Sequence, residues 1–426
     1  MSKLSALDSK QITNCQVCQS EYLRSLIFLG FVPPVNEMLG IESISDAEMR
    51  FPLELLRCEN CSLVQIGYEV DQRILFPHTY PYLSGTTRIL RENFKDLANE
   101  INTLFGIRIN DVVLDVGAND GTLLMPFKEL GYRVLGIEPS QAAEIAINQG
   151  IPIVKDYFGK KATQYIHEKY GKMKIITAAN VFAHIKDVHE IVDAITHLLD
   201  QDGVFVSESH YLLDLVETLQ YDTIYHEHLR YYSLNSLIYL FKKHGLEVFR
   251  VKRIPTHGGS IRVYAARTGN YPIHKSVTEC LAAEQAFGLI DGNVFDSFRS
   301  RIIQSKLELL KLLCSIKAEK KRVVGIGAPS RATTLINYAG LDDGLIDSVM
   351  EVSTSHKLNK FVPGTRIPVV NEERLYDEQQ DYALMFSWHI GDELAKHLFK
   401  KGFQGDIIIP LPTPRIVTSA QTIMDK

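Results

Sequence analysis

DVVLDVGANDG, at residues 111–121, says more about the fold of this 426-residue chain than any other segment. Asp111–Val116 is a short apolar run that predicts a buried strand. Gly117 and Gly121 let the backbone turn tightly and approach a ligand, and a helix expected over Thr122–Leu130 points its N-terminus there. The GxxxG spacing after Asp115, in place of GxGxxG, favours S-adenosylmethionine over a dinucleotide.

Strands and helices continue to alternate after this segment. Further strands are expected at Arg133–Ile137, Pro152–Lys155, Lys174–Ala178, Val204–Ser207, Glu247–Arg253 and Ile261–Ala266, and helices at Ala142–Asn148, Val188–Leu199 and Leu234–His244. Such alternation builds a mostly parallel, doubly wound sheet, and the last two strands, joined by THGGS (256–260), predict an antiparallel pair at its edge. This is the strand order of a class I methyltransferase.

Polar and aromatic residues follow the predicted strands where a cofactor would bind. Glu138 ends the second strand, and its carboxylate can accept hydrogen bonds from both ribose hydroxyls. Asp156 and Phe158 follow the third strand, where an adenine would lie, and Asn180 follows the fourth. The predicted ligands of S-adenosylmethionine are therefore Asp115, Gly117, Asn119, Gly121, Glu138, Asp156, Phe158 and Asn180.

YDTIYHEHLRYYS (221–233) is a segment rich in titratable side chains, with neither a helical nor a strand period, so we expect an ordered loop. His226 and His228 can exchange protons near neutral pH. The segment could equally be a surface loop whose rings pack on a helix. It follows a strand ending in VSES (206–209), however, so it emerges beside the cofactor loops, as do His184 and His257. That convergence favours a site of proton chemistry.

Cys15, Cys18, Cys58 and Cys61 form two C-x2-C pairs near the N-terminus. Four thiolates at this spacing predict a closed, tetrahedral and therefore structural zinc site, with a redox role as the weaker alternative. Between this unit and the first strand lies FPHTYPYLSGTT (76–87), which is either a linker or an aromatic lid carrying Tyr80 and Tyr82.

A second α/β unit closes the chain. Residues 273–320 have a helical pattern and lead into RVVGIG (322–327), an apolar strand with a glycine turn. Glu351 ends a later strand, as in a dinucleotide site, but Ser330 stands at the third glycine position. We therefore expect a nucleotide or phosphate at this turn instead of NAD.

Composition narrows the class of protein. The chain is 45% apolar and 23% charged, as in soluble globular proteins, and it has no apolar run long enough to span a membrane. A net charge of -5 gives no basic surface for nucleic acid. These features predict a cytoplasmic protein whose main partner is not nucleic acid.

The whole chain resembles the S-adenosylmethionine-dependent sugar C-methyltransferases of deoxysugar biosynthesis. The motifs that carry the resemblance are the two C-x2-C pairs, DVGANDG (115–121), NVFAH (180–184), YHEH (225–228), HGGSIR (257–262), GAPSRATTLINY (327–338), PGTRIP (363–368) and PLP (410–412). The resemblance implies a zinc-binding domain at 1–75, a methyltransferase domain at 76–270, and a helical bridge with a Rossmann-like domain at 271–426. It also implies a nucleotide-diphospho-4-keto-deoxysugar as substrate.

The same resemblance implies residue roles. His228 would be the general base that removes the proton beside the ketone. Its companions would be Tyr225, Glu227 and His184, with Tyr80 and Tyr82 from the lid, whereas His226 would be structural. The substrate ligands would be His257, Gly258, Ser260, Arg262 and Arg331.

The chain departs from the common family pattern in its C-terminal unit. Ser330-Arg331-Ala332 stands for Ala-Lys-Gly, Glu351 for Asp, and His389 for Asn. These departures concern the substrate more than the methyl transfer, so O-methylation and an inactive, binding-only protein remain as alternatives.

Overall fold

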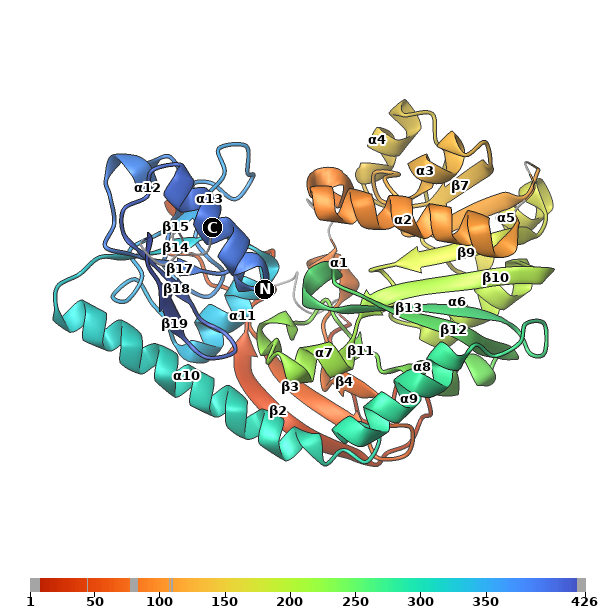
Figure 1. The fold of residues 1–426 in the computed structure, drawn as a ribbon, viewed down its shortest axis with the longest axis horizontal. Helices are drawn as coiled ribbons and strands as arrows, with labels where there is room; N and C mark the ends of the chain where they lie inside the picture. Colours follow the sequence, from red (N-terminus) through yellow and green to blue (C-terminus); the bar gives the residue numbers. More distant parts are fainter. Residues whose placement is uncertain (1–7, 44, 77–82, 107, 109, 420–426) are drawn as a thin grey trace.

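The computed structural model describes residues 8–43, 45–76, 83–106, 108 and 110–419 (Figure 1). Tyr80 and Tyr82 lie outside the described residues. Figure 1 shows the C-terminal unit on the left, the large sheet on the right, and the N-terminal strands between and below them. In the described part of the chain, no helix is both long and apolar enough to cross a membrane.

The N-terminal unit is a small antiparallel sheet. Its order is β11-β4-β3-β2, with β2 at Leu23–Val32, β3 at Phe51–Cys58, β4 at Val64–Ile66 and β11 at Arg230–Tyr231. A separate pair joins β1 (Lys10–Gln11) to β5 (Tyr68–Glu69), and α1 spans Gln72–Leu75. Strand β11 belongs to residues 221–233, which we call the histidine-rich loop, so this sheet holds the C-terminal end of that loop.

The central sheet has the order β12-β13-β10-β9-β6-β7-β8, and it is parallel except around β13, which runs antiparallel to both its neighbours. The strands are β6 (Val112–Val116), β7 (Arg133–Ile137), β8 (Ile153–Val154), β9 (Met173–Ala179), β10 (Leu199–His210), β12 (Leu246–Ile254) and β13 (Ser260–Arg267). The predicted class I methyltransferase core with an antiparallel edge pair is confirmed.

Helices flank this sheet. They are α2 (Arg88–Phe105), α3 (Leu124–Glu129), α4 (Ala142–Asn148), α5 (Lys160–Tyr170), α6 (Val188–Leu198), α7 (Leu212–Glu217) and α8 (Leu234–Lys242). Helix α2 buries Leu90, Phe94, Leu97 and Ile101, spaced three or four residues apart, so that one face packs on the sheet. Helix α5 was not predicted, because it buries only Ala162, Thr163 and Ile166 and so carries a weak apolar signal.

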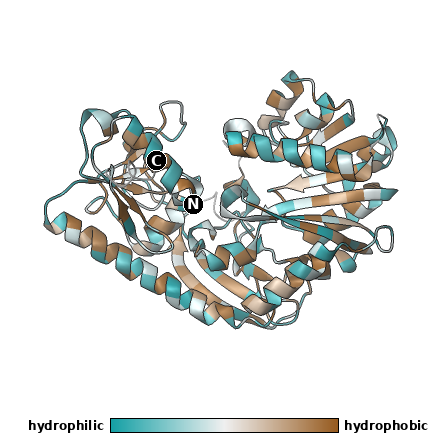
Figure 2. Cartoon of the chain, viewed as in Figure 1, coloured by the Kyte–Doolittle hydropathy of each residue, from teal (hydrophilic) through white to brown (hydrophobic). Residues whose placement is uncertain are grey.

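The C-terminal unit is a second α/β layer, as predicted. Helices α9 (Lys275–Phe287) and α10 (Val294–Ala318) lead into the sheet β16-β15-β14-β17-β18-β19. Its strands are β14 (Val323–Ile326), β15 (Val349–Glu351), β16 (Val369–Asn371), β17 (Tyr382–Met385), β18 (Asp406–Ile409) and the antiparallel β19 (Arg415–Val417). Its helices are α11 (Ser330–Ala339), α12 (Arg374–Asp377) and α13 (Gly391–Lys400). Figure 2 shows that the strands of the central sheet and of the C-terminal sheet are largely hydrophobic. The outer helices carry both hydrophobic and hydrophilic residues.

Candidate active site

The glycine turn after β6 can be built only from small residues. Gly117 and Gly121 have φ angles of 72° and 80°, in the left-handed region that favours glycine. A Cβ on Gly117 would lie 2.7 Å from Cγ2 of Val181, and one on Gly121 would lie 2.6 Å from Cδ1 of Ile151. The turn therefore needs glycine at both positions, and it lies at the carboxyl ends of the parallel strands, which we call the carboxyl rim.

Two buried carboxylates support this turn. Oε2 of Glu138 accepts a hydrogen bond from the backbone N–H of Asn119 at 3.0 Å, and Oε1 accepts one from Ser140 at 2.8 Å. Each oxygen has a second lone pair that a ribose hydroxyl can use. Asp115 accepts a hydrogen bond from the Thr177 hydroxyl at 2.6 Å. Burial raises the pKa of Asp115 to about 7, the nearby Glu138 adds to this shift, and the Thr177 hydroxyl opposes it.

The other predicted cofactor residues also lie at the carboxyl rim. Asp156 and Phe158 follow β8 and are half-buried. Asn180 follows β9 with a φ of 57°, and its side-chain Nδ2 is buried with no partner among the described residues. A buried amide donor without a partner is costly, so this atom fits a position that a ligand's acceptor completes.

The segment before α2 lies against the glycine turn. The backbone N–H of Ser84 donates to Oδ1 of Asn119 at 2.9 Å, and that of Gly85 donates to Oδ2 of Asp120 at 2.8 Å. Ser84 and Gly85 therefore lie against the glycine turn.

The ring proton of His228 can be placed from its contacts. Nδ1 lies 2.8 Å from the carbonyl oxygen of Thr223, and a carbonyl only accepts, so Nδ1 carries the hydrogen. Burial, together with the nearby His184, holds the pKa of His228 well below its usual range, which keeps the ring neutral. Nε2 is then left with a lone pair, as a general base requires.

Other rings surround His228. The ring centroids of Tyr225 and His184 lie 4.1 Å and 4.9 Å from it. The prediction missed His210, which lies 5.3 Å from His228 and 5.4 Å from His257. His210 is the last residue of β10, so its place at a strand end on the carboxyl rim was the signal that could have found it.

Three parts of the chain meet at Glu227. Nδ2 of Asn36, from the N-terminal unit, donates to Oε1 of Glu227 at 2.7 Å. Oδ1 of Asn36 accepts from the hydroxyl of Ser330, in the C-terminal unit, at 3.2 Å. His226 instead donates from Nε2 to the carbonyl of Pro52 at 3.2 Å, which agrees with the structural role expected for it.

Arg331, expected as a substrate ligand, has an anionic partner inside the protein. This residue is buried, and its Nε and Nη2 lie 2.8 Å and 2.9 Å from the two carboxylate oxygens of Asp222. The indole Nε1 of Trp388 also donates to Asp222, at 2.7 Å. Because Asp222 neutralises the guanidinium, Arg331 anchors the histidine-rich loop and is not free to pair with a substrate phosphate.

Arg262 also serves the fold. Its Nε lies 3.0 Å from Oε2 of Glu208, its direct neighbour across the β10–β13 pair, and its Nη1 lies 2.9 Å from Glu100. With 1% of its surface exposed, Arg262 is held by these two carboxylates inside the protein.

The rest of the HGGS motif shapes the turn that carries His257. The carbonyl of Gly258 accepts a hydrogen bond from Nε2 of Gln220 at 2.6 Å, and the Ser260 hydroxyl donates to Thr256 at 3.0 Å. His257 has a φ of 56°, and its Nε2 is buried with no partner among the described residues. Among the predicted substrate ligands, His257 is therefore the one with a free polar atom.

The four cysteines converge as a closed metal site. Their sulfur atoms all lie within 4.8 Å of one another. The Sγ atoms of Cys15 and Cys61 are 3.5 Å apart, and those of Cys18 and Cys58 are 3.4 Å apart. Burial raises the pKa of Cys58 to about 11, so four thiolates need a cation among them. The donor set fits one zinc ion and leaves no position for a substrate.

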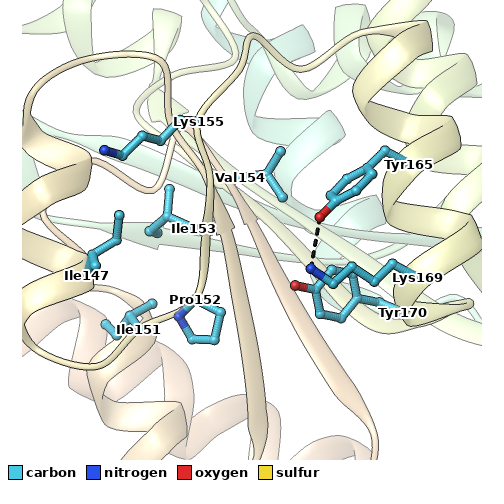
Figure 3. A pocket seen from close by; sticks show the side chains of 9 residues that line it. All are labelled: Ile147, Ile151, Pro152, Ile153, Val154, Lys155, Tyr165, Lys169 and Tyr170. Carbon is cyan, nitrogen blue, oxygen red and sulfur yellow. Dashed lines mark hydrogen bonds between the residues drawn. The ribbon is translucent and has the colours of Figure 1, made fainter.

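A surface pocket of about 500 Å³ lies elsewhere, between β8 and α5 (Figure 3). Figure 3 shows apolar side chains such as Ile147 and Ile153 facing Tyr165 and Lys169 across it. None of the predicted site residues lines it.

Comparisons with known proteins identify the family of the chain. Family models match a zinc binding domain at residues 15–76, a methyltransferase domain at 89–251 and a C-methyltransferase C-terminal domain at 255–412. The C-methyltransferase NovU of Streptomyces niveus is 30% identical over 97% of this chain and 99% of that protein. The chain belongs to the C-methyltransferase family. This C-methyltransferase is therefore an S-adenosylmethionine-dependent enzyme with a zinc-binding N-terminal domain.

Two further proteins are similar to part of the chain. The ubiquinone biosynthesis O-methyltransferase of Rhodopseudomonas palustris (strain HaA2) is 30% identical to this C-methyltransferase over 26% of the chain and 44% of that protein. The solved magnesium protoporphyrin IX methyltransferase of Synechocystis PCC 6803 is 14% identical, over 42% of this chain and 83% of that one, with a TM-score of 0.34.

If Glu138 binds the ribose as expected, replacing it by alanine should weaken cofactor binding by about 1.5–3 kcal/mol, because two hydrogen bonds to ribose would be lost. The measurement is calorimetry with S-adenosylhomocysteine. Glu144→Ala, on the exposed side of α4, is the control and should bind normally. Unchanged affinity in Glu138→Ala would show that the cofactor of this C-methyltransferase binds elsewhere.

Replacing Arg331 by methionine should lower the free energy of unfolding by about 3–5 kcal/mol, because a buried carboxylate at Asp222 loses its partner. Urea unfolding measures this. Adding Asp222→Leu should recover much of the loss. Arg415→Met, which breaks an exposed pair with Asp392, should cost under about 1 kcal/mol. Equal losses in the two single variants would rule out a buried anchoring pair.

Proposed function

We propose that this C-methyltransferase transfers a methyl group to carbon in a nucleotide-diphospho-4-keto-deoxysugar. The observation that carries the proposal is the state of His228: a buried, neutral imidazole whose Nδ1–H is held by Thr223 and whose Nε2 keeps its lone pair. A base of this kind is needed to make a carbon nucleophile and is not needed to bind a cofactor.

His228 and the rings around it have different roles in forming the enolate. Nε2 of His228 takes the proton from the carbon beside the ketone, and the electron pair of that C–H bond moves into an enolate. Tyr225 and His184, whose rings contact His228, are placed to stabilise the negative charge on the enolate oxygen. S-adenosylmethionine, when bound, would supply the methyl group, and the enolate carbon would form its bond to that methyl as the methyl–sulfur bond breaks and S-adenosylhomocysteine leaves.

Glu227 has a positioning role in this proposal. Its carboxylate is held by Asn36, so the N-terminal unit helps to fix the loop that carries the base. Arg331 and Trp388 hold Asp222, one residue before the Thr223 carbonyl that orients His228. Residues from all three units of the chain thus help to position the imidazole of His228.

Three facts support the substrate class. The motifs YHEH and HGGS resemble those of sugar C-methyltransferases, and NovU carries the name of a C-methyltransferase. In addition, the turn carrying His257 packs against residues 388–390 of the C-terminal unit. A substrate with a sugar at His228 could therefore extend its nucleotide toward that unit.

The test begins with thermal-shift screening of nucleotide-sugars in the presence of S-adenosylhomocysteine. Ligands that stabilise the protein are then incubated with S-adenosylmethionine labelled with carbon-13 in its methyl group. We expect a 4-keto-deoxysugar to stabilise the protein and the labelled methyl to be bonded to carbon. A labelled methyl ether would establish O-methylation, and no product from any stabilising ligand would favour a binding protein.

A further inference from the structure

We infer that His389 is a specificity-determining residue that donates a hydrogen bond from Nε2 to a carbonyl or hydroxyl oxygen of the substrate. The inference rests on the proposed function, because it takes the substrate to be a sugar bound near His228. It adds a residue from the C-terminal unit to the candidate site.

The ring hydrogen of His389 can be placed because its hydrogen-bond partner, Arg331, can only donate. Nη1 of Arg331 lies 2.8 Å from Nδ1 of His389. A guanidinium donates and cannot accept, so Nδ1 must present its lone pair. The hydrogen of the neutral ring is then on Nε2. Burial and the adjacent Arg331 charge lower the pKa of His389 to about 3, so the ring stays neutral over the working pH range.

Nε2 of His389 is available to a ligand. The ring is half-buried, and this nitrogen makes no hydrogen bond to any residue in the described ranges. His389 lies in the short helical turn Trp388–Ile390, which packs against the turn Thr256–Gly258 that carries His257. From His257 the ring contacts pass through His210 to His228. The donor therefore belongs to the same group of imidazoles as the base.

The planar guanidinium of Arg331 fixes the position of the His389 ring relative to Asp222. Nε and Nη2 hold Asp222 while Nη1 reaches His389, which is a use of all three nitrogens that lysine cannot reproduce. Arg331 is thus a positioning residue for His389.

Charge decides what His389 recognises. Asp222 cancels the charge of Arg331, and His389 is itself neutral, so the cluster presents a hydrogen-bond donor without net positive charge. Such a donor suits an uncharged acceptor, a sugar carbonyl or hydroxyl, better than a phosphate, for which a free cation would be expected.

Two variants separate recognition from folding. His389→Gln should preserve function, because its amide oxygen can accept from Arg331 while its amide nitrogen donates in place of Nε2. His389→Phe keeps the ring and removes both atoms. With a thymidine-diphospho-4-keto-6-deoxyhexose as probe, we expect kcat/KM to fall about 10- to 100-fold in His389→Phe, mainly through KM, and less than about threefold in His389→Gln. Affinity for S-adenosylhomocysteine should stay unchanged in both.

Nitrogen-15 spectra of the histidine-labelled full chain test the proton placement without any substrate. We expect the Nδ1 resonance of His389 to be that of a lone-pair nitrogen from pH 6 to pH 9, and to change in Arg331→Lys. A proton on Nδ1, titration near pH 6.5, or a normal KM in His389→Phe would overturn the inference. If the unaltered chain methylates no keto-sugar, the proposed function has failed and the recognition of a sugar by His389 fails with it, whereas a wrong ring-proton placement in a chain that does methylate a keto-sugar overturns the inference alone.

Discussion

Replacing Cys58 by alanine is expected to release the zinc ion and unfold the N-terminal unit while the central sheet stays folded. The four sulfur atoms lie close enough to share one ion, and structural zinc contributes folding free energy directly, about 10–16 kcal/mol in small zinc-finger peptides. Because β4 pairs with β11, the variant should also loosen the histidine-rich loop and lose methyl transfer.

Elemental analysis and thermal unfolding of the purified full chain measure these effects. Cys314→Ala is the matched control, since Cys314 is exposed on α10, and it should keep both zinc and stability. Unaltered protein that contains no zinc after purification without chelator would contradict the assignment.

Replacing His228 by asparagine should lower kcat by about 10²- to 10⁴-fold, the contribution of a positioned general base. Asparagine keeps the approximate size and a polar group but cannot take the proton. Affinity for the cofactor should barely change, because the cofactor residues lie on the other strands of the carboxyl rim. Steady-state kinetics and calorimetry together test this.

His226→Asn is the control for the same loop. His226 faces Pro52 in the N-terminal unit, so its loss should affect stability more than the chemical step. The pH dependence gives a second check. Because the pKa of His228 is lowered, the ring stays neutral as the pH falls through 6.5, and the rate should fall only at lower pH. Near-normal turnover in His228→Asn would show that another group is the base.

Positions on the carboxyl rim could be predicted from sequence because Asp115 lies near the end of β6, and Glu138 and Asn180 directly follow β7 and β9. Asp115, Glu138 and Asn180 needed only the order of the elements, since the carboxyl ends of parallel strands meet at one edge of a sheet. The four cysteines could be predicted equally well, because their spacing alone indicates the metal site.

The roles of the arginines could not be read in the same way. Arg331 follows a glycine turn and so looks like a phosphate ligand, but its partner Asp222 lies 109 residues earlier in the chain. Arg262 stands in a motif shared with active-site residues, yet the β10–β13 register places it opposite Glu208. Charge pairing across units and strand register are properties of the packed chain.

Hydrogen exchange at the carbon beside the ketone tests the central claim most directly. The unaltered protein is incubated with the stabilising 4-keto-deoxysugar and S-adenosylhomocysteine in deuterium oxide, and the sugar is followed by proton NMR. We expect loss of one signal beside the ketone without methyl transfer, because proton abstraction by His228 needs only the base and enolate stabilisation. Methylation of that sugar with S-adenosylmethionine, but no exchange and a methyl ether as product, would contradict C-methylation through an enolate.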